Sequence, residues 1–529
     1  MPRYEKGVVS FRVSSESEST EATAKAGRGG LAVLAAKVFF ILVGFIQQPL
    51  LKGVMGLAGY GALSGRVLPI SNILNNVIVS GSTQSVSRLV AQNPRHQHAA
   101  LRHALRIHTP IAGAVAIGFI VFAPIYTRFQ GAPHILLPLL VMSGVALLYG
   151  LYAPLIGYLN GRGQFVRQAS LDVLFATLRT VLLVGGSYLL GKLFGLGVLG
   201  ACLGFVGAAA LILPIALRWT GTGSSDPNAS LPPARAYLTQ WFMISGAQLA
   251  MNALMQSDIS ILGHCLSKQA SQGAWLADPS KASDEWLGVY RACQLFAFLP
   301  YQLLFSVTQV LFPMLARAHS DGDHERVRAL VLRGSRIALL LCGLLVSIVV
   351  TLPGSLLHFA YGSDVAERGA TTLRLLASGM SAFALLALAL TILTSLGRER
   401  WSLAITFGSS AVVAVVMLVV VRNAPFGEPQ LLRTALTMAA VLAAAFVVAT
   451  VSVHRRASVF FPISTFLRVF VVVVTLALAG RALPILSRVL TPVAAALVAL
   501  FYFAMLALTR ELSRFDLDLV RSVFKRRAS

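Results

Sequence analysis

The chain has 529 residues, of which 56% are hydrophobic and only 12% are charged, and its mean hydropathy is +0.75. A soluble globular protein carries about 25% charged residues, so this composition excludes an ordinary soluble fold and indicates a surface that mostly faces lipid. The net charge of +24 would favour nucleic-acid binding in a soluble protein. Here the basic residues lie mainly in short stretches between apolar runs, which is typical of membrane orientation, and we expect no nucleic-acid partner.

The predicted elements begin after a polar segment at 1–30, which lacks the apolar core of a signal peptide and is expected to be a disordered cytoplasmic tail. Apolar stretches of about 17–25 residues then recur, the length that spans a ~30 Å hydrocarbon core. They lie at 31–51, 61–83, 108–126, 135–157, 169–190, 196–218, 237–263, 286–314, 334–353, 372–396, 401–421, 431–452, 463–482 and 486–509. The sequence therefore predicts an all-α polytopic membrane protein with about fourteen transmembrane helices.

The basic residues of the connecting loops predict the orientation of these helices. An even number of spans places both termini on one side, and the loops on that side carry more arginine and lysine than the opposite loops, with Arg162, Arg326 and Arg455 among them. Positive charge marks the cytoplasmic side, so both termini are predicted to be cytoplasmic. The basic tail at 510–529 is expected to lie along the inner headgroups as a short amphipathic helix.

An internal repeat appears when the sequence is shifted by 225 residues, because Arg66 then meets Arg291 and Gln84 meets Gln309. The matched helices are the second and the eighth, so the repeat preserves membrane orientation and predicts two parallel six-helix lobes. The predicted lobes are 31–218 and 237–452, joined by a cytoplasmic linker at 219–236 and followed by helices 13 and 14 at 453–509. Transporters built from two such lobes bind substrate between them and alternate access.

Basic residues inside predicted spans are candidate substrate contacts, because a charge within the bilayer is costly and usually faces the bundle interior. Arg66 and Arg291 are related by the repeat, and Lys37 lies about two turns into the first helix. Together they predict a cationic cavity suited to a phosphate or diphosphate, since arginine binds phosphate oxygens bidentately and keeps its charge. The alternative is that each side chain snorkels to the nearest membrane surface.

Acidic residues inside predicted spans are fewer. Asp258, in the seventh helix, has no obvious partner in the sequence, and it is a candidate for proton or sodium coupling. The alternative is a paired structural carboxylate. Asp172 and Arg179 lie seven residues apart in the fifth helix, and a structural neutralisation, within this helix or between helices, is expected for them.

Amide side chains stripe the second and eighth helices. They are expected to line a wet cavity and bind sugar hydroxyls, or alternatively to bridge helices at ~0.6–2 kcal/mol each. The candidate lining residues are Asn72, Asn76, Gln84, Gln294 and Gln309.

Metal, cofactor and disulfide chemistry receive little support from the sequence. The four cysteines are scattered singly, and the histidines at 96, 98, 103 and 108 have no carboxylate or cysteine nearby, so solvated or lipid-facing histidines are expected there, with no metal and no cofactor. Outer-loop residues Asp278, Asp284 and Glu285 show no paired histidine, so we expect a protein that is not an enzyme.

Several gapped patterns of glycine, proline and aromatic residues resemble those of a known family. They are GLAGYGALSG, SGSTQSVSRLVA, GYLNGRGQFVRQASLDVLFATLR and WLGVYRACQLFAFLPYQLLFSVTQVLFPMLA. Over about 31–510 the chain resembles the oligosaccharide (O-antigen type) flippases of the multidrug/oligosaccharidyl-lipid/polysaccharide exporter (MOP) superfamily, and it is similar also to the lipid II flippase, whose first, second and eighth helices supply cavity cations.

The resemblance implies a bacterial inner-membrane transporter that flips a polyprenyl-diphosphate-linked oligosaccharide to the outer leaflet by alternating access, for polysaccharide biosynthesis. The lipid-linked glycan, the bilayer and the polysaccharide polymerase machinery are the implied partners. A cation-coupled multidrug exporter of the same superfamily is the alternative, which would need acidic cavity residues. A membrane glycosyltransferase or ligase is a third reading, and the short outer loop near 265–285 argues against it.

Overall fold

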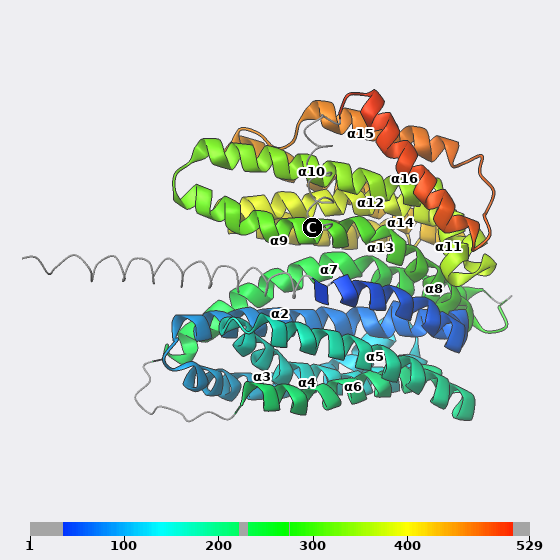
Figure 1. Ribbon diagram of the computed structural model, residues 1–529. Coiled ribbons are helices and arrows are strands. Elements are labelled where there is room, and N and C mark those ends of the chain that lie inside the picture. The colour runs from blue at the N-terminus through cyan, green and yellow to red at the C-terminus, as the bar shows by residue number, and fades with distance from the viewer. Residues whose placement is uncertain (1–34, 37, 222–230, 274–275, 512–529) are drawn as a thin grey trace, which may run out of the picture. The chain divides into compact units, whose positions relative to one another are not determined.

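The computed structural model describes residues 35–36, 38–221, 231–273 and 276–511, without the side chains of residues 306, 309 and 310. The predicted tail at 1–30, the candidate Lys37, half of the linker at 219–236 and nearly all of the basic tail at 510–529 lie outside these residues. Every regular element in the described part of the chain is a helix, as Figure 1 shows. The predicted all-α polytopic class is confirmed.

The helices follow one another through short connections. Their bounds are η1 Ala62–Val67 (a π-helix), α2 Leu68–Gln92, α3 Gln97–Gln130, η2 Pro133–Ile135 (a 3-10 turn), α4 Leu136–Gly161, α5 Phe165–Phe194, α6 Gly197–Thr220, α7 Ala234–Gln272, α8 Pro279–Ala297, α9 Leu299–Ser320, α10 His324–Thr351, α11 Pro353–Tyr361, α12 Ser363–Ser395, α13 Glu399–Val420, α14 Glu428–Ala457, α15 Ile463–Ala479 and α16 Leu490–Leu508.

The described helices are consistent with about fourteen spans. Within the described residues, ten helical segments are long and apolar enough to cross a membrane, and the first of them, Val38–Gln92, has 55 residues. At 1.5 Å per residue that is about 80 Å, far more than one ~30 Å crossing. Gly56, between the predicted spans at 31–51 and 61–83, has a φ of +74° and so departs locally from the right-handed α conformation.

The remaining predicted spans are shorter or more polar than these ten segments. Helix α15 has only 17 residues, and α7 and the α8–α9 pair carry many polar side chains. The predicted span 286–314 is in fact two helices that meet at Phe298, because Pro300 stands at the start of α9 and cannot supply the N–H that a continuous helix needs. The short helix α11 was not expected from the sequence.

Two compact units make up the chain. One contains residues 1–50, 71–126 and 136–249, and the other contains 51–70, 127–135 and 250–529. In the first, α6 packs against α4 and α5; in the second, α12 packs against α8, α9, α11 and α14, and α9, α10, α12 and α14 run side by side in Figure 1. The predicted division into lobes at 31–218 and 237–452 remains a prediction.

Candidate functional site

Arg66 lies on the π-helical turn η1, which rests directly against α8. The close approach depends on Gly61, where a Cβ atom would lie 1.8 Å from the carbonyl oxygen of Asp284. The glycine-rich sequence GLAGYGALSG therefore allows the two backbones to meet. A π-helical turn widens the local ladder and is frequently found at functional sites, and here it carries the arginine side chain to the acidic residue on α8.

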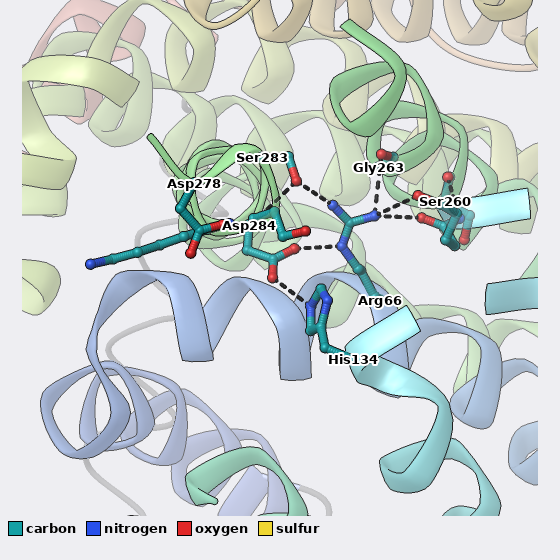
Figure 2. A network of polar contacts seen from close by, with 10 residues as sticks. Arg66, His134, Ser260, Gly263, Asp278, Ser283 and Asp284 are labelled. Atoms are coloured by element: carbon teal, nitrogen blue, oxygen red, sulfur yellow. Dashed lines mark hydrogen bonds and ion pairs between the residues drawn. The ribbon is translucent and has the colours of Figure 1, made fainter. Parts of the chain in front are cut away.

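The guanidinium of Arg66 is completely buried, with 0% of the side chain exposed. Its Nε donates to Asp284 Oδ1 at 2.5 Å, and its Nη2 donates to Ser283 Oγ at 2.9 Å. Nη1 donates to Gln130 Oε1 at 3.0 Å and to the carbonyl oxygen of Gly263 at 3.2 Å. Figure 2 shows the guanidinium among Asp284, Ser283 and Gly263. All three guanidinium nitrogens are therefore engaged by protein acceptors.

His134 lies on the turn η2, which immediately precedes α4, and it also contacts Asp284. Its Nε2 lies 2.8 Å from the second oxygen of Asp284, so the expectation that Asp284 has no paired histidine is wrong. The two residues are 150 positions apart, which is why the sequence gives no signal of the pair. Arg66, Gln130, His134, Ser283 and Asp284 are called the Arg66 cluster below.

Every guanidinium nitrogen of Arg66 is already hydrogen-bonded inside the protein, so a ligand cannot reach this arginine in this state. A bound anion would have to displace Asp284, and breaking a buried ion pair by removing one partner costs about 3–5 kcal/mol. The structure thus gives Arg66 a structural contact that the internal repeat did not predict.

Asp258, on α7, is also fully buried, and it is not alone. Its Oδ2 accepts hydrogen bonds from Tyr290 Oη at 2.7 Å and from Gln294 Nε2 at 2.8 Å. Its Oδ1 accepts from the backbone N–H of Ile259 at 2.7 Å. Each of these three groups donates a hydrogen bond to a carboxyl oxygen of Asp258.

Arg291, on α8, has surroundings very different from those of Arg66. The side chain is half-buried, and Nη1 donates to Gln294 Oε1 at 2.9 Å. Arg291 lies close enough to Asp258, Tyr60 and Tyr361 for its charge to act on all three, and those two tyrosine hydroxyls lie 3.1 Å apart. Among the described residues Arg291 makes no ion pair, so its remaining donors are available.

The structure therefore groups the sequence candidates in an unexpected way. Arg291, Gln294 and Asp258 form one network with Tyr290, called the Arg291 cluster below, whereas Arg66 belongs to the other cluster. Asp284 and Arg291 are seven residues apart on α8, about 10 Å at 1.5 Å per residue. Sequence reasoning missed Asp284, His134, Gln130 and Tyr290 as partners. Each of their contacts joins segments that lie at least 32 residues apart in the chain.

The amide candidates on α2 have accessible side chains. Asn72 is half-buried, and Asn76 and Gln84 are exposed. Asn75 is buried, and neither atom of its amide has a partner among the described residues. The side chain of Gln309 lies outside the described part of the chain, as Lys37 does.

The guanidinium of Arg179 lies over the rings of Phe40 at 4.9 Å and Phe205 at 5.6 Å, a cation–π arrangement that stabilises a desolvated cation. The expected structural neutralisation of Asp172 and Arg179 remains a prediction. The expectation of a solvated or lipid-facing histidine is wrong at position 108. His108 is buried, not solvated, and its Nε2 lies 2.7 Å from Tyr237 Oη.

The chain also matches known families. The sequence profile of the family described as polysaccharide biosynthesis protein matches residues 26–319, more than half of the chain. The chain belongs to the polysaccharide biosynthesis protein family. The MatE profile matches residues 280–420, a range that includes most of α8 and all of α9 to α13.

Solved structures share the fold at low sequence identity. The lipid II flippase MurJ in an inward closed conformation has a TM-score of 0.70 at 12% identity, over 93% of this chain and 100% of that chain. A multidrug resistance MATE family transporter of the MOP superfamily, in an inward-facing conformation, has a TM-score of 0.65 at 15% identity, over 81% and 98%.

A MOP superfamily transporter from Pyrococcus furiosus has a TM-score of 0.59 at 15% identity, over 81% of this chain and 95% of that chain. A search of curated proteins finds no match. The family profiles and the shared fold confirm the resemblance found in the sequence: this is a multi-pass membrane transporter of the MOP superfamily.

Proposed function

We propose that this transporter flips a polyprenyl-diphosphate-linked oligosaccharide from the cytoplasmic to the outer leaflet, for polysaccharide biosynthesis, by alternating access. The observation that carries the proposal is the state of the charges around α8. Asp258 and Asp284 are both satisfied by protein donors, whereas Arg291 keeps guanidinium donors that no described residue uses. The charge left for a ligand is therefore positive.

A diphosphate head group fits that charge. It cannot cross hydrocarbon bare, because transfer of an unpaired charge from water is prohibitively costly. A guanidinium binds phosphate oxygens through parallel N–H donors and stays protonated at every physiological pH. Arg291 is the proposed first contact, and Arg66 joins it only in a state where the head group replaces Asp284.

The other candidates fill supporting roles in this proposal. Lys37 adds a third cation, and the amides Asn72, Asn76, Gln84 and Gln309 bind glycan hydroxyls. The polymerase machinery receives the product in the outer leaflet.

Flipping of a fluorescent polyprenyl-diphosphate lipid in proteoliposomes tests the proposal. Arg291→Ala should lower the initial rate about ten- to a hundredfold, the range expected for losing a hydrogen-bonded charge of about 1.5–3 kcal/mol. Arg291→Lys keeps the positive charge but lacks the parallel N–H donors of a guanidinium. Its initial rate should lie between those of wild type and Arg291→Ala. The control is Arg400→Ala, an exposed arginine at the start of α13. Equal rates for Arg291→Ala and Arg400→Ala would remove the diphosphate assignment.

The proposed setting is the bacterial plasma membrane, with both termini cytoplasmic. Single cysteines at the exposed positions Arg95 and Ser271 test this sidedness, because all four native cysteines are buried. An impermeant maleimide added to intact cells should label Ser271→Cys and spare Arg95→Cys. The reverse pattern would invert the topology.

A cation-coupled multidrug exporter is the second candidate, and the MatE profile over residues 280–420 favours it. A cationic drug needs an unengaged carboxylate, and direct binding of ethidium that is lost in Asp258→Asn would support this reading over ours. A glycosyltransferase or ligase has less support, because Asp278 caps α8 through Lys281 N and Glu285 pairs with Arg368, so both have structural roles.

A further inference from the structure

We infer that Asp258 and Gln294 are positioning residues that aim the Arg291 guanidinium at the anionic head group. The inference rests on the proposed function, and it gives Asp258 a different task from the ion coupling for which it was a candidate. The evidence is the directed chain of hydrogen bonds from Arg291 through Gln294 to Asp258.

The direction of that chain follows from the chemistry of its two ends. A carboxylate only accepts hydrogen bonds and a guanidinium only donates them. The amide between them must therefore turn its nitrogen toward Asp258 and its oxygen toward Arg291, as the distances of 2.8 Å and 2.9 Å show. The reversed amide would face oxygen to oxygen and nitrogen to nitrogen, so the two charges together fix one orientation of Gln294.

Asp258 can restrain the Gln294 amide because further hydrogen bonds fix the carboxylate itself. Its Oδ2 also accepts the hydroxyl of Tyr290, one helical turn before Gln294 on α8, and all three side chains are buried. The carboxylate thus ties α7 to two successive turns of α8. Gln294 then restrains Nη1 of Arg291, one turn back on the same helix, and leaves Nε and Nη2 for a ligand.

The same contacts argue against a cation at Asp258. A coupling ion would need carboxylate oxygens that point at other oxygen ligands. Here Tyr290, Gln294 and the N–H of Ile259 direct three protons at the two oxygens, and the positive charge of Arg291 lies nearby. A cation would have to displace those donors against that charge.

Binding of farnesyl diphosphate to the full chain in nanodiscs, with farnesol as the uncharged control, tests the inference. Gln294→Leu and Asp258→Leu should each weaken binding about three- to tenfold, the range for one hydrogen bond, and the double variant should be no weaker than the worse single one. Asp258→Asn keeps an acceptor oxygen for Tyr290 and Gln294, so it should recover most of the affinity. Equal losses for Asp258→Asn and Asp258→Leu, with Gln294→Leu unchanged, would overturn the inference in favour of a role for the charge itself.

A second measurement follows the chemical accessibility of the Arg291 guanidinium in the absence of any diphosphate ligand. Phenylglyoxal modifies accessible guanidinium groups, and mass spectrometry of the peptide that contains residue 291 gives the rate. Gln294→Leu and Asp258→Leu should change that rate severalfold, and Asp258→Asn should not. If wild type fails to bind farnesyl diphosphate but shows this labelling pattern, the proposed function fails and the positioning role stands. Identical labelling in all variants overturns the positioning role.

Discussion

The Arg66 cluster and the Arg291 cluster contrast two arginines that the predicted internal repeat aligns. Arg66 is fully buried and donates through every guanidinium nitrogen, with a carboxylate as one acceptor, whereas Arg291 is half-buried and donates to one amide. Two arginines that align in the sequence therefore have different chemical surroundings. The difference arises from their neighbours: a close backbone approach at Gly61 brings Asp284 to Arg66, but Asp258 reaches Arg291 only through Gln294.

Removing the carboxylate from the Arg66 cluster is the largest expected effect on stability. Asp284→Ala leaves Arg66 as an uncompensated buried charge, and the free energy of unfolding should fall by about 3–5 kcal/mol. Thermal unfolding in detergent, followed by thiol exposure of the buried cysteines, measures the loss.

The matched control for Asp284→Ala is Asp364→Ala, which breaks the Lys52–Asp364 pair, where the side chain of Asp364 is 46% exposed. An exposed pair contributes about 0–1 kcal/mol, so the midpoint should scarcely move. The double variant Arg66→Met with Asp284→Leu should recover stability, because an apolar pair replaces a buried ionic one. If Asp284→Ala and Asp364→Ala unfold alike, the Arg66 cluster does not stabilise the fold.

A smaller effect is expected from separating η1 from α8. Gly61→Ala places a methyl group where the carbonyl oxygen of Asp284 lies, and relieving such an overlap costs about 1–3 kcal/mol. Gly53→Ala, eight residues earlier in the same helical stretch, meets nothing within 4 Å and should leave the unfolding midpoint unchanged. Equal midpoints for the two variants would show that the close approach is not needed.

The smallest expected effect concerns a third charged group, at the membrane edge. Burial opposes ionisation of Glu511, but hydrogen bonds from Thr465, Arg468 and Arg336 outweigh it and hold the pKa of the carboxyl below its ordinary value. Its stabilising contribution, on the order of 1 kcal/mol because the two arginines are partly exposed, is therefore complete above the ordinary glutamate pKa of about 4.3. It is lost as the pH falls through the lower folded value.

Hydrogen exchange of the α15–α16 pair between pH 6 and pH 3.5 measures this effect. Exchange corrected for its intrinsic pH dependence should rise toward acid in wild type. In Glu511→Gln it should be raised already at pH 6 and should change little with pH. A parallel rise in both proteins would mean that Glu511 does not hold the terminal pair in place.

Much of the fold was predictable because a bilayer demands long apolar helices. The span at 169–190 falls within α5 and the span at 401–421 matches α13 to within two residues at each end, and apolar side chains predominate in both helices. The helix α11 was not predicted, since hydropathy is continuous through it. At Phe298, the neighbouring Pro300 indicates a kink or hinge, but a proline in the sequence does not show whether the helix bends or ends.

The candidate site was predictable only as a set of residue types. A charged or amide side chain inside a span is costly and usually has a functional or structural role. This cost identified Arg66, Arg291, Gln294 and Asp258. Their partners were not identified, since Arg66 and Asp284 are 218 residues apart and His134 and Asp284 are 150 apart.

The sequence by itself determined that this chain is a helical membrane protein of the MOP superfamily with basic residues inside its spans, because apolar length and charge cost are properties of single segments. Only the tertiary structure decided that Arg66 is fully hydrogen-bonded within the protein and that Arg291 keeps N–H donors for a ligand. That depends on which carboxylates and amides arrive from distant segments, and such pairing is a matter of three-dimensional packing that no local pattern records.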